Sequence, residues 1–335
     1  MRKEIHVAFA LDVAYLKQAA IAIASIIANA STPEDLRFYI VHAEDEDRIA
    51  ELTADWRVPH LTTVRAGNPF AEVGDHTHVS NAALIRTLLP DLLHHLDRLI
   101  YLDVDLVVTG DIRDLWDSDL HGNAIGGVLD IGVHVHAARE KVYGGSKRRN
   151  GLALLGLDPD RPEYINSGVL LMDLDKLRDI GFGALAQDMD RQFRGRLLYV
   201  DQDIVNCLVA GRVQLLDPRW NVSAKLWSGK DRRRHHYVAE HLSDQLALQK
   251  REQWLVHWVG RHKPWNNGSV WRAEEWWRYA GLSGLEWERP EPRRRSFGSL
   301  LRDVWLDARS MLSALRYRLH RLANPPQPAD ERTAD

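Results

Sequence analysis

Two aspartates stand two residues apart in an otherwise apolar stretch, RLIYLDVDLVVTGD, which covers residues 98–111. Side chains two positions apart in a strand point to the same side, so Asp103 and Asp105 would face one point if the strand ends there. Two carboxylates that converge make a hard-oxygen site for Mg²⁺ or Mn²⁺. The spacing alone equally allows a carboxylate that caps the following turn or helix, because D-x-D is a common tripeptide.

A second group of polar residues lies in VHWVGRHKPW, residues 256–265. His257 offers an imidazole, which is a better ligand for Mn²⁺ than for Mg²⁺. Gly260 permits a close backbone approach to a phosphate, and Lys263 offers a point charge for phosphate oxygens. By itself this stretch is typical of a surface loop, but together with the aspartates it predicts a diphosphate held through a divalent metal. A nucleoside diphosphate is the obvious ligand of that kind.

The elements that must position these residues alternate along the first two thirds of the chain. The hydrophobic pattern predicts strands at 5–11, 36–43, 61–66, 98–108, 124–130 and 166–174, and helices at 14–30, 48–56, 81–93, 175–194 and 202–211. This alternation indicates an α/β fold with a mostly parallel, doubly wound sheet, whose ligands bind at the carboxyl ends of the strands. After about residue 225 the pattern changes, and eight of the 12 tryptophans lie between Trp254 and Trp305, where we expect them to pack rather than to stack on sugars.

The composition limits the class of protein. The chain has 335 residues, of which 45% are hydrophobic, so it can form one large α/β domain with an appendage, or two domains. Its net charge of −3 argues against a nucleic-acid binder. The single cysteine, Cys207, excludes an intrachain disulfide and a cysteine metal cluster. We see no signal peptide, and the apolar segment 19–30 is too short to span a bilayer, so we expect a cytoplasmic protein.

The C-terminal residues 293–322 combine a helical apolar stripe with eight arginines against two aspartates, a local charge of +6, since 8 − 2 = 6. A basic amphipathic helix of this kind is typical of a helix that lies in a membrane interface. A helix that docks on its own domain, or a dimer contact, remains an alternative. We expect a catalytic domain at 1–285, a linker and basic amphipathic helix at 286–323, and a disordered tail at 324–335.

These segments, taken in order, resemble the retaining glycosyltransferases of family 8, which include bacterial lipopolysaccharide α-galactosyl- and α-glucosyltransferases and the glycogenins. The resemblance covers roughly residues 5–280 and rests on VAFALDVAYLKQAAIAIASI, LIRTLLPDLL, RLIYLDVDLVVTGDIRDLWD, YINSGVLLMDL, DQDIVNCLVAGRVQLLDPRWN and HWVGRHKPW. It implies the glycosyltransferase-A fold, a Rossmann-like mixed sheet flanked by helices, here with a helical C-terminal appendage. It also implies a divalent metal, Mn²⁺ or Mg²⁺, held by the D-x-D aspartates.

The resemblance implies roles for the residues of the metal and diphosphate sites. Asp103, Asp105 and His257 match the metal ligands of the family. Val104, between the two aspartates, is placed with the donor-binding residues. Gly260 and Lys263 match the loop that binds the diphosphate.

Further matches concern the nucleoside and the sugar. Ala10, Leu11, Asp12 and Tyr15 fall on the first-strand motif that holds uridine, where Asp12 would meet the uracil and Tyr15 would stack on it. Arg86 matches an arginine that contacts the donor near its sugar. The other matches are Asn166, Ser167 and Gly168 at a sugar-facing strand end, and Asp201, Gln202 and Asp203 beneath the anomeric carbon.

The chain departs from the family pattern in its first motif. Many members read Asp-Asp-Asn-Tyr where this chain reads Asp12-Val13-Ala14-Tyr15. Ala14 cannot hydrogen-bond a ribose, so the effect of this residue on nucleoside binding stays open.

The function that the resemblance implies is transfer of a hexose, glucose or galactose, from a uridine diphosphate sugar to an acceptor hydroxyl, with retention and with assistance from Mn²⁺. A glycan or a lipid-linked acceptor in the synthesis of a cell-surface glycan such as lipopolysaccharide would favour a peripheral position on the inner face of the membrane. Two alternatives remain. A phosphohydrolase of the haloacid dehalogenase type has a similar D-x-D motif, normally near the N-terminus, and a non-catalytic protein could bind sugar nucleotides or glycans on the same fold.

Overall fold

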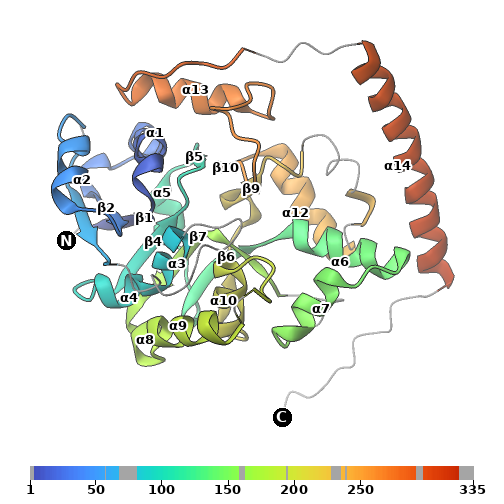
Figure 1. The fold of residues 1–335 in the computed structure, drawn as a ribbon, viewed down its shortest axis with the longest axis horizontal. Helices are drawn as coiled ribbons and strands as arrows, with labels where there is room; N and C mark the ends of the chain where they lie inside the picture. The colour runs from blue at the N-terminus through green and yellow to red at the C-terminus, as the bar shows by residue number, and fades with distance from the viewer. Residues whose placement is uncertain are drawn as a thin grey trace.

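The computed structural model describes residues 4–56, 58–67, 81–157, 163–193, 195–227, 235–237, 240–291 and 297–323. Their centre is a seven-stranded sheet with the order β3-β2-β1-β4-β7-β6-β8 (Figure 1). The strands are β1 Ile5–Ala10, β2 Leu36–His42, β3 Leu61–Arg65, β4 Arg98–Leu102, β6 Ile125–Leu129, β7 Ile165–Asp173 and β8 Val213–Leu215. Helices cover the sheet, which confirms the predicted α/β class with a mixed sheet.

One strand of the sheet runs against the others. β1 is parallel to β2 and β4, and β6 is parallel to β8, but β7 is antiparallel to both β4 and β6. The expectation of a mostly parallel sheet is therefore confirmed, with β7 as the strand that makes the sheet mixed. An apolar run indicates a buried strand and not its direction, because side chains alternate in the same way in both orientations. As a result, the beginning of β7 meets the end of β4 at the same sheet edge.

The predicted strand 98–108 is two strands in two different sheets. β4 ends at Leu102, and β5, Leu106–Val108, pairs antiparallel with β10, Leu255–His257. β10 also pairs in parallel with β9, Val222–Ser223, which completes a small second sheet. Residues 99–102 and 106–108 are all buried, so the sequence on both sides of the corner is apolar and gives no sign of it. The corner itself is the Asp-Val-Asp segment.

The helices of the described residues lie on both faces of the large sheet, beside the small sheet and along α6. They are α1 Leu16–Asn29, α2 Glu46–Thr53, α3 Asn81–Ile85, α4 Leu89–Leu92, α5 Ile112–Trp116, α6 Ile131–Tyr143, α7 Lys147–Leu154, α8 Leu174–Asp179, α9 Phe182–Phe193, α10 Asp201–Leu208, α12 Glu240–Arg251, α13 Ala273–Leu282 and α14 Phe297–Ala323. One core cluster places the alanines and isoleucines of α1 on one face, and another places α4, α8 and α10 on the opposite face. The predicted helix 175–194 is divided into α8 and α9 at Gly181, whose φ of +66° ends the first of them.

The tryptophan-rich segment stabilises the small sheet. Trp258 and Trp276 are buried in one cluster with Val107 of β5 and Val256 of β10, and Trp265, Trp271, Trp277 and Trp287 pack against it. The expectation that these tryptophans pack is therefore confirmed for this cluster. This packing matters for the site because it holds β10, which ends at His257, and the next residues lead toward Lys263.

The last described element, α14, lies along one side of the molecule, next to α6 (Figure 1). Within the described residues, no helix is both long and apolar enough to cross a membrane. The predicted disordered tail 324–335 lies outside the described residues. The domain boundaries at 285 and 323 stay predictions.

Candidate metal and sugar-nucleotide site

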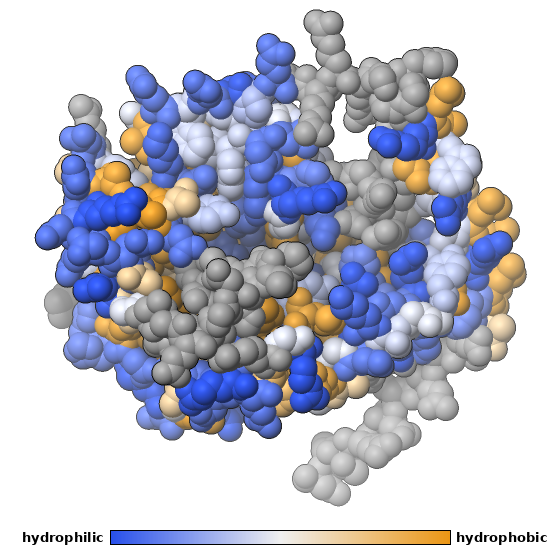
Figure 2. Space-filling model, viewed as in Figure 1, coloured by the Kyte–Doolittle hydropathy of each residue, from blue (hydrophilic) through white to orange (hydrophobic). Residues whose placement is uncertain are grey.

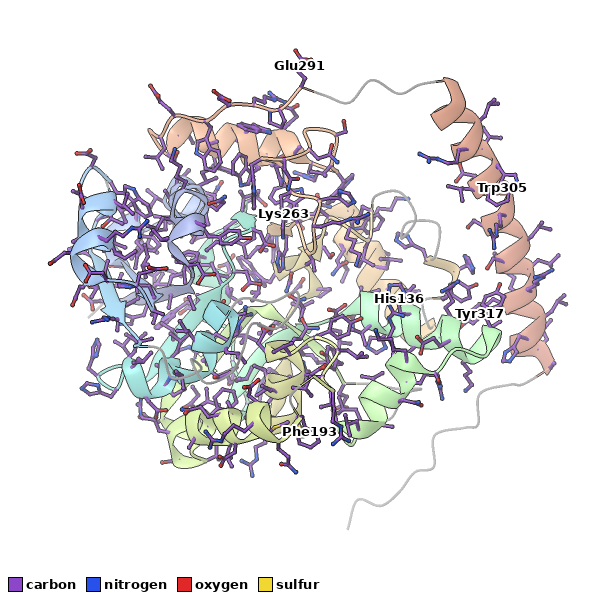
Figure 3. All side chains as sticks on the ribbon, in the orientation of Figure 1. His136, Phe193, Lys263, Glu291, Trp305 and Tyr317 are labelled. Carbon is purple, nitrogen blue, oxygen red and sulfur yellow. The ribbon has the colours of Figure 1, made fainter. Side chains whose placement is uncertain are left out.

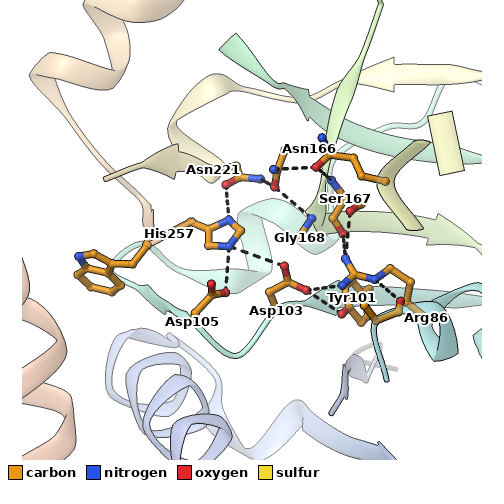
Figure 4. A network of polar contacts seen from close by, with 12 residues as sticks. Arg86, Tyr101, Asp103, Asp105, Asn166, Ser167, Gly168, Asn221 and His257 are labelled. Carbon is orange, nitrogen blue, oxygen red and sulfur yellow. Dashed lines mark hydrogen bonds and ion pairs between the residues drawn. The ribbon is translucent and has the colours of Figure 1, made fainter. Parts of the chain in front are cut away.

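Asp103, Asp105 and His257 meet where the large and small sheets join. Their candidate ligand atoms all lie within 4.8 Å of one another. The His257 Nε2 atom is 3.0 Å from Asp105 Oδ1 and 3.7 Å from Asp103 Oδ2 (Figure 4). The corner between β4 and β5 brings the two aspartates to this point, and the end of β10 supplies the histidine. Two carboxylates and one imidazole are the donor set that Mn²⁺ accepts.

The orientation of His257 depends on an asparagine that sequence analysis did not single out. The His257 Nδ1–H donates to Asn221 Oδ1 at 3.0 Å, and Asn221 Nδ2 donates to Asn166 Oδ1 at 2.8 Å. With Nδ1 used in this way, Nε2 is the ring atom that faces the carboxylates, and in a neutral imidazole its lone pair would be available to a metal ion held between them. The only available signal was that Asn221 ends the family motif DQDIVNCLVAGRVQLLDPRWN.

Two of the three candidate metal ligands, His257 and Asp103, pack directly against Gly168. A Cβ atom built on Gly168 would lie 2.4 Å from His257 Cε1 and 2.5 Å from Asp103 Oδ2. The Asp103 N–H also donates to the Gly168 carbonyl at 2.8 Å. A side chain here would therefore push apart the groups that converge, which gives the glycine in Asn-Ser-Gly a steric reason.

We predict that Gly168→Ala weakens Mn²⁺ binding by about tenfold or more, because His257 and Asp103 must move apart to admit the methyl group. The same crowding should lower the free energy of unfolding by about 1–3 kcal/mol. Paramagnetic resonance titration of Mn²⁺ and chemical denaturation measure the two effects. The matched control is Gly281→Ala in α13, where the new Cβ meets nothing within 4 Å and Mn²⁺ binding should not change. Wild-type Mn²⁺ affinity in Gly168→Ala would contradict this assignment.

The positive partner of Asp103 is Arg86, a 6%-exposed guanidinium in the short 3-10 helix η3, Arg86–Leu88. Arg86 Nη2 lies 3.0 Å from Asp103 Oδ1, and Arg86 Nε lies 3.3 Å from Asp201 Oδ2. The guanidinium packs 4.7 Å from the centre of the Tyr101 ring, and the Tyr101 hydroxyl donates to Asp103 Oδ1 at 2.8 Å. Burial by itself would lower the pKa of Arg86, but the two carboxylates raise it above its ordinary value.

The positive partner of Asp105 is Lys263. The Lys263 ammonium donates to Asp105 Oδ2 and, at 2.7 Å, to the Trp258 carbonyl. Burial alone would raise the pKa of the Asp105 carboxyl, but Lys263 and His257 hold it well below its usual range. Lys263 therefore contacts a carboxylate that would also bind the metal. This position suits the predicted role of its loop, which is to bind the diphosphate beside the metal. Gly260 has a φ of +86°, so the turn before Lys263 requires a glycine for conformational reasons as well.

A second polar network begins beside Arg86. Gln202 Oε1 accepts from Asn166 Nδ2 at 3.0 Å and from the Ser167 N–H at 3.2 Å, and Gln202 Nε2 donates to Asp130 Oδ2 at 3.1 Å. Asp201 Oδ2 accepts from Ser167 Oγ at 3.1 Å. Burial raises the pKa of the Asp201 carboxyl, and Arg86 offsets only part of that rise. Asn166, Ser167, Asp201 and Gln202 therefore form one network, which Ser167 and Asp201 join to Arg86.

Asp203 lies apart from this network. Its Oδ1 accepts from the Tyr164 hydroxyl, and its Oδ2 accepts from the N–H groups of Leu198 and Tyr199 at 2.7 and 2.9 Å. Both carboxylate oxygens are thus used to hold the segment before α10. Of the three residues predicted beneath the anomeric carbon, the structure brings together Asp201 and Gln202.

The residues predicted to bind uridine lie at the end of β1. The parallel register of β1 and β4, continued by two residues from the Ala8–Tyr101 pair, brings Ala10 level with Asp103. Asp12 precedes η1, Val13–Tyr15, without making a side-chain capping hydrogen bond, and Tyr15 is 42% exposed. Asp12 therefore does not cap the helical turn that follows it. Val104 packs against the core cluster beside α1, which leaves its backbone as the part able to meet a ligand.

The chain matches the model of a family described as Glycosyl transferase family 8 over residues 6–268. It is 28% identical to a lipopolysaccharide 1,2-glucosyltransferase of Escherichia coli, over 86% of this chain and 80% of that protein. It is 25% identical to general stress protein A of Bacillus subtilis, over 80% and 91%. Among solved structures, the galactosyltransferase LgtC, crystallised with donor and acceptor sugar analogues, superimposes with a TM-score of 0.67 at 24% identity, covering 83% of this chain and 95% of that one.

Proposed function

The chain belongs to glycosyl transferase family 8, and on that premise we propose that it transfers a hexose from a uridine diphosphate sugar to an acceptor hydroxyl, with retention and with assistance from Mn²⁺. The observation that carries the proposal is the convergence of Asp103, Asp105 and His257 with Lys263 at the end of β4, level with the end of β1. Asp103, Asp105 and His257 would hold the metal. Lys263 and the turn at Gly260 would bind the diphosphate.

The donor would lie along the sheet edge from β1 to β7. Ala10, Asp12 and Tyr15 would hold the uridine at one end, with the backbone of Val104 beside it. Arg86, Asn166 and Ser167 would orient the sugar at the other end. When bound, a divalent ion neutralises the charge that develops on the leaving diphosphate. Lys263 adds a fixed positive charge in the same place, at no cost in reorganisation.

The hydrogen bonds of Gln202 favour one of the two possible routes to retention of the anomeric configuration. The Gln202 Oε1 atom accepts two N–H donors, from Asn166 and Ser167, which withdraws electron density from an amide oxygen that is already a poor nucleophile. A covalent intermediate on Gln202 is therefore disfavoured, and we propose a front-face route in which the departing phosphate accepts the proton of the acceptor. Asp201 would balance positive charge on the sugar, and Asp203 would act as a positioning residue through Tyr164 and Leu198.

We predict that Gln202→Ala lowers kcat by about 10²-fold while changing the Kd for the donor by no more than about threefold, because Gln202 would act at the reacting sugar and not at the diphosphate. Asp201→Ala should follow the same pattern. Steady-state kinetics and calorimetric titration of the donor separate the two parameters. If both variants kept wild-type kcat, the reaction centre would have to lie elsewhere.

The experiment that tests the proposed activity is a panel of sugar nucleotides with release of the nucleoside diphosphate as readout. The proposal expects release of uridine diphosphate from one hexose donor, faster when an acceptor is present. Hydrolysis of generic phosphate esters would favour a phosphohydrolase of the haloacid dehalogenase type instead. Tight donor binding without any turnover would favour a non-catalytic binder.

The relative named as a lipopolysaccharide 1,2-glucosyltransferase supports a glycan or lipid-linked acceptor in cell-surface glycan synthesis, and α14 supports a place for the protein on the membrane surface. The apolar side chains of α14 are exposed, including Trp305 at 57% and Met311 at 74%. Figure 2 shows apolar side chains along the outer edge of the molecule, where α14 lies. The other members of this exposed apolar stripe are Leu301, Val304, Leu312, Leu315, Leu319 and Leu322.

The opposite face of α14 contacts the rest of the chain. Ser313 Oγ forms a hydrogen bond with the Tyr143 hydroxyl at 2.8 Å, and the Tyr317 ring packs 5.0 Å from the Tyr237 ring. At 100° per residue, Ser313 and Tyr317 lie about 180° around the helix from the centre of the apolar stripe. The helix therefore docks on its own domain, which was the alternative for this segment, and still exposes its apolar face. Docking through one face leaves the other free for a membrane surface.

We predict that the full chain co-sediments with anionic liposomes and that a chain ending at Pro292 does not. Each arginine near an anionic surface contributes about 1 kcal/mol, so added salt should release the full chain. The truncated chain should keep its activity on a soluble acceptor, because α14 contributes no residue to the site. Equal sedimentation of the two chains, or binding that salt does not weaken, would argue against a membrane role for α14.

A further inference from the structure

A cleft of about 570 Å³ lies between α14 and the pair formed by α6 and η5, His235–Tyr237. It is distinct from the site at Asp103, and it belongs to no part of the proposed reaction. Figure 3 shows Tyr317 of α14 at this junction, next to α6. The cleft is lined by Arg139, Tyr143, His236, Tyr237, Leu306, Arg309, Ser310, Leu312, Ser313 and Arg316.

The lining is strongly cationic. Arg139 comes from α6, and Arg309 and Arg316 come from α14. None of these three guanidinium groups forms an ion pair with a carboxylate among the residues that the structure describes, and no aspartate or glutamate is found among the lining residues. Guanidinium groups that converge without a counter-ion are what a phosphate-binding site requires.

The two arginines of α14 share one flank of the helix. Arg309 and Arg316 are seven residues apart, so they lie about two turns apart on the same side. That flank borders the apolar stripe through Leu312, which lines the cleft and is exposed to solvent. Arg318 lies on the opposite flank, about 160–180° around the helix from Arg309 and Arg316, and does not line the cleft.

Hydroxyl groups complete the lining. Ser313 Oγ forms hydrogen bonds with the hydroxyls of both Tyr143 and Tyr237. Hydroxyl groups rotate to suit their partners, so a member of this cluster can turn its O–H toward an acceptor in the cleft. Burial alone would raise the pKa of the Tyr143 phenol, but these hydrogen bonds and the charges of Arg316 and Arg139 lower it, which reflects the positive potential at this point.

We propose that this cleft binds a phosphate group, with Arg139, Arg309 and Arg316 as cationic contacts and the hydroxyls around Ser313 as hydrogen-bond donors. The volume of the cleft is far larger than one phosphate and fits a phosphate ester. Leu306 and Leu312 give the cleft an apolar margin that continues into the exposed stripe of α14. The source is either the headgroup of a membrane lipid or a phosphate free in solution, and the two are distinguished by experiment.

The position of the cleft separates it from catalysis. α6 begins after Asp130, which contacts Gln202 and Asn166, and ends at Tyr143, which lines the cleft. Its 13 residues span about 20 Å, so a phosphate bound here would not compete with the donor. The proposal does not depend on the sugar donor. It adds a specific contact for a phosphate group to the proposed membrane role of α14.

The test compares Arg309→Gln with Arg318→Gln in the full chain. Both variants remove one positive charge from α14, so a general attraction to an anionic surface falls equally in both. We expect Arg309→Gln to weaken binding to phosphatidylcholine vesicles containing phosphatidic acid by about tenfold more than Arg318→Gln does, because only Arg309 loses a charge-assisted hydrogen bond to phosphate. Arg309→Lys should recover part of the loss.

A second arm identifies the source of the phosphate. Inorganic phosphate is added to the full chain, and the melting temperature is compared with that in potassium chloride of equal ionic strength. Stabilisation by phosphate that Arg309→Gln loses and Arg318→Gln keeps indicates a site open to free phosphate. A difference on vesicles alone indicates a lipid headgroup. If the two variants behave alike in both arms, the proposal is wrong, and unchanged release of uridine diphosphate by both shows that this failure does not concern the sugar site.

Discussion

Asp105→Asn is expected to lower turnover by about 10³-fold and to leave the fold intact, because the amide keeps the shape of the side chain and loses its charge. Asp105 is the carboxylate on which His257 and Lys263 both converge. Without its charge, the proposed metal loses a ligand and Lys263 loses its anchor. Asp103→Asn should have an effect of the same size, since Asp103 joins the metal site to Arg86. Turnover with the preferred donor and far-ultraviolet circular dichroism measure activity and fold.

The matched control is Asp119→Asn. Asp119 belongs to the same part of the chain, but its side chain is 73% exposed and its ion-pair partner is His121. Its replacement should leave turnover within about twofold of the wild type, because exposed ion pairs contribute little. Asp105→Asn or Asp103→Asn with more than about a tenth of wild-type turnover would be incompatible with the electrostatic role assigned to this corner.

Arg86→Met is expected to have the largest effect on stability, a loss of about 3–5 kcal/mol, because it leaves the buried carboxylate of Asp201 and the partly buried carboxylate of Asp103 without their cation. Arg86→Lys should cost less, since it keeps the charge but not the fork that reaches both carboxylates and the Ser167 carbonyl. Chemical denaturation gives both values. Arg191→Met, which breaks an exposed pair with Asp188, is the control and should change stability by less than about 1 kcal/mol.

The loss of unfolding free energy caused by Arg86→Met should depend on pH. Burial already raises the pKa of Asp201 in the wild type, and Arg86 lowers it in part. Without Arg86, that pKa rises further above its value in the unfolded chain, so the folded variant binds protons that the unfolded chain releases. The variant is then most stable at low pH and loses stability as the pH rises through the raised pKa. A deficit equally large at pH 5 and pH 8 would show that Asp201 is not the group left unpaired.

Sequence patterns predicted the residues of the site better than the partners that hold them. The spacing of Asp103 and Asp105 predicted that they converge if the strand ends there, and they do, because β4 ends at Leu102. The apolar pattern of 98–108 did not reveal the corner, since residues 99–102 of β4 and all of β5 are buried. An apolar run contains no signal for a change of sheet.

The contacts that carry the electrostatics join residues far apart in the chain. Arg86 was identified by resemblance, but its two partners, Asp103 and Asp201, depend on how η3 packs against β4 and α10. Asn221 could not be singled out, because its function is to orient His257. The resemblance placed Gly168 at a sugar-facing strand end, whereas in the structure the side chains that lie against Gly168 are those of Asp103 and His257.

The direction of β7 also determines which of its residues lie beside Asp103. A parallel β7 would begin at the opposite edge of the sheet and carry Asn166 and Ser167 away from Asp103. The antiparallel register pairs Leu102 with Val169 and so brings Gly168 level with Asp103. Local sequence indicates the strand, but an apolar run contains no signal for the direction in which the strand pairs with its neighbours.

The most direct test of the central claim, that Asp103, Asp105 and His257 hold a divalent ion to which the donor diphosphate binds, is calorimetric titration of uridine diphosphate into the full chain. It is performed with Mn²⁺, with a chelator, and with Mn²⁺ restored after the chelator. The account predicts that the chelator weakens binding by at least about tenfold, that Mn²⁺ restores it, and that Asp105→Asn resembles the chelated wild type even with Mn²⁺ present. Equal affinity with and without Mn²⁺, or wild-type affinity in Asp105→Asn, would contradict it.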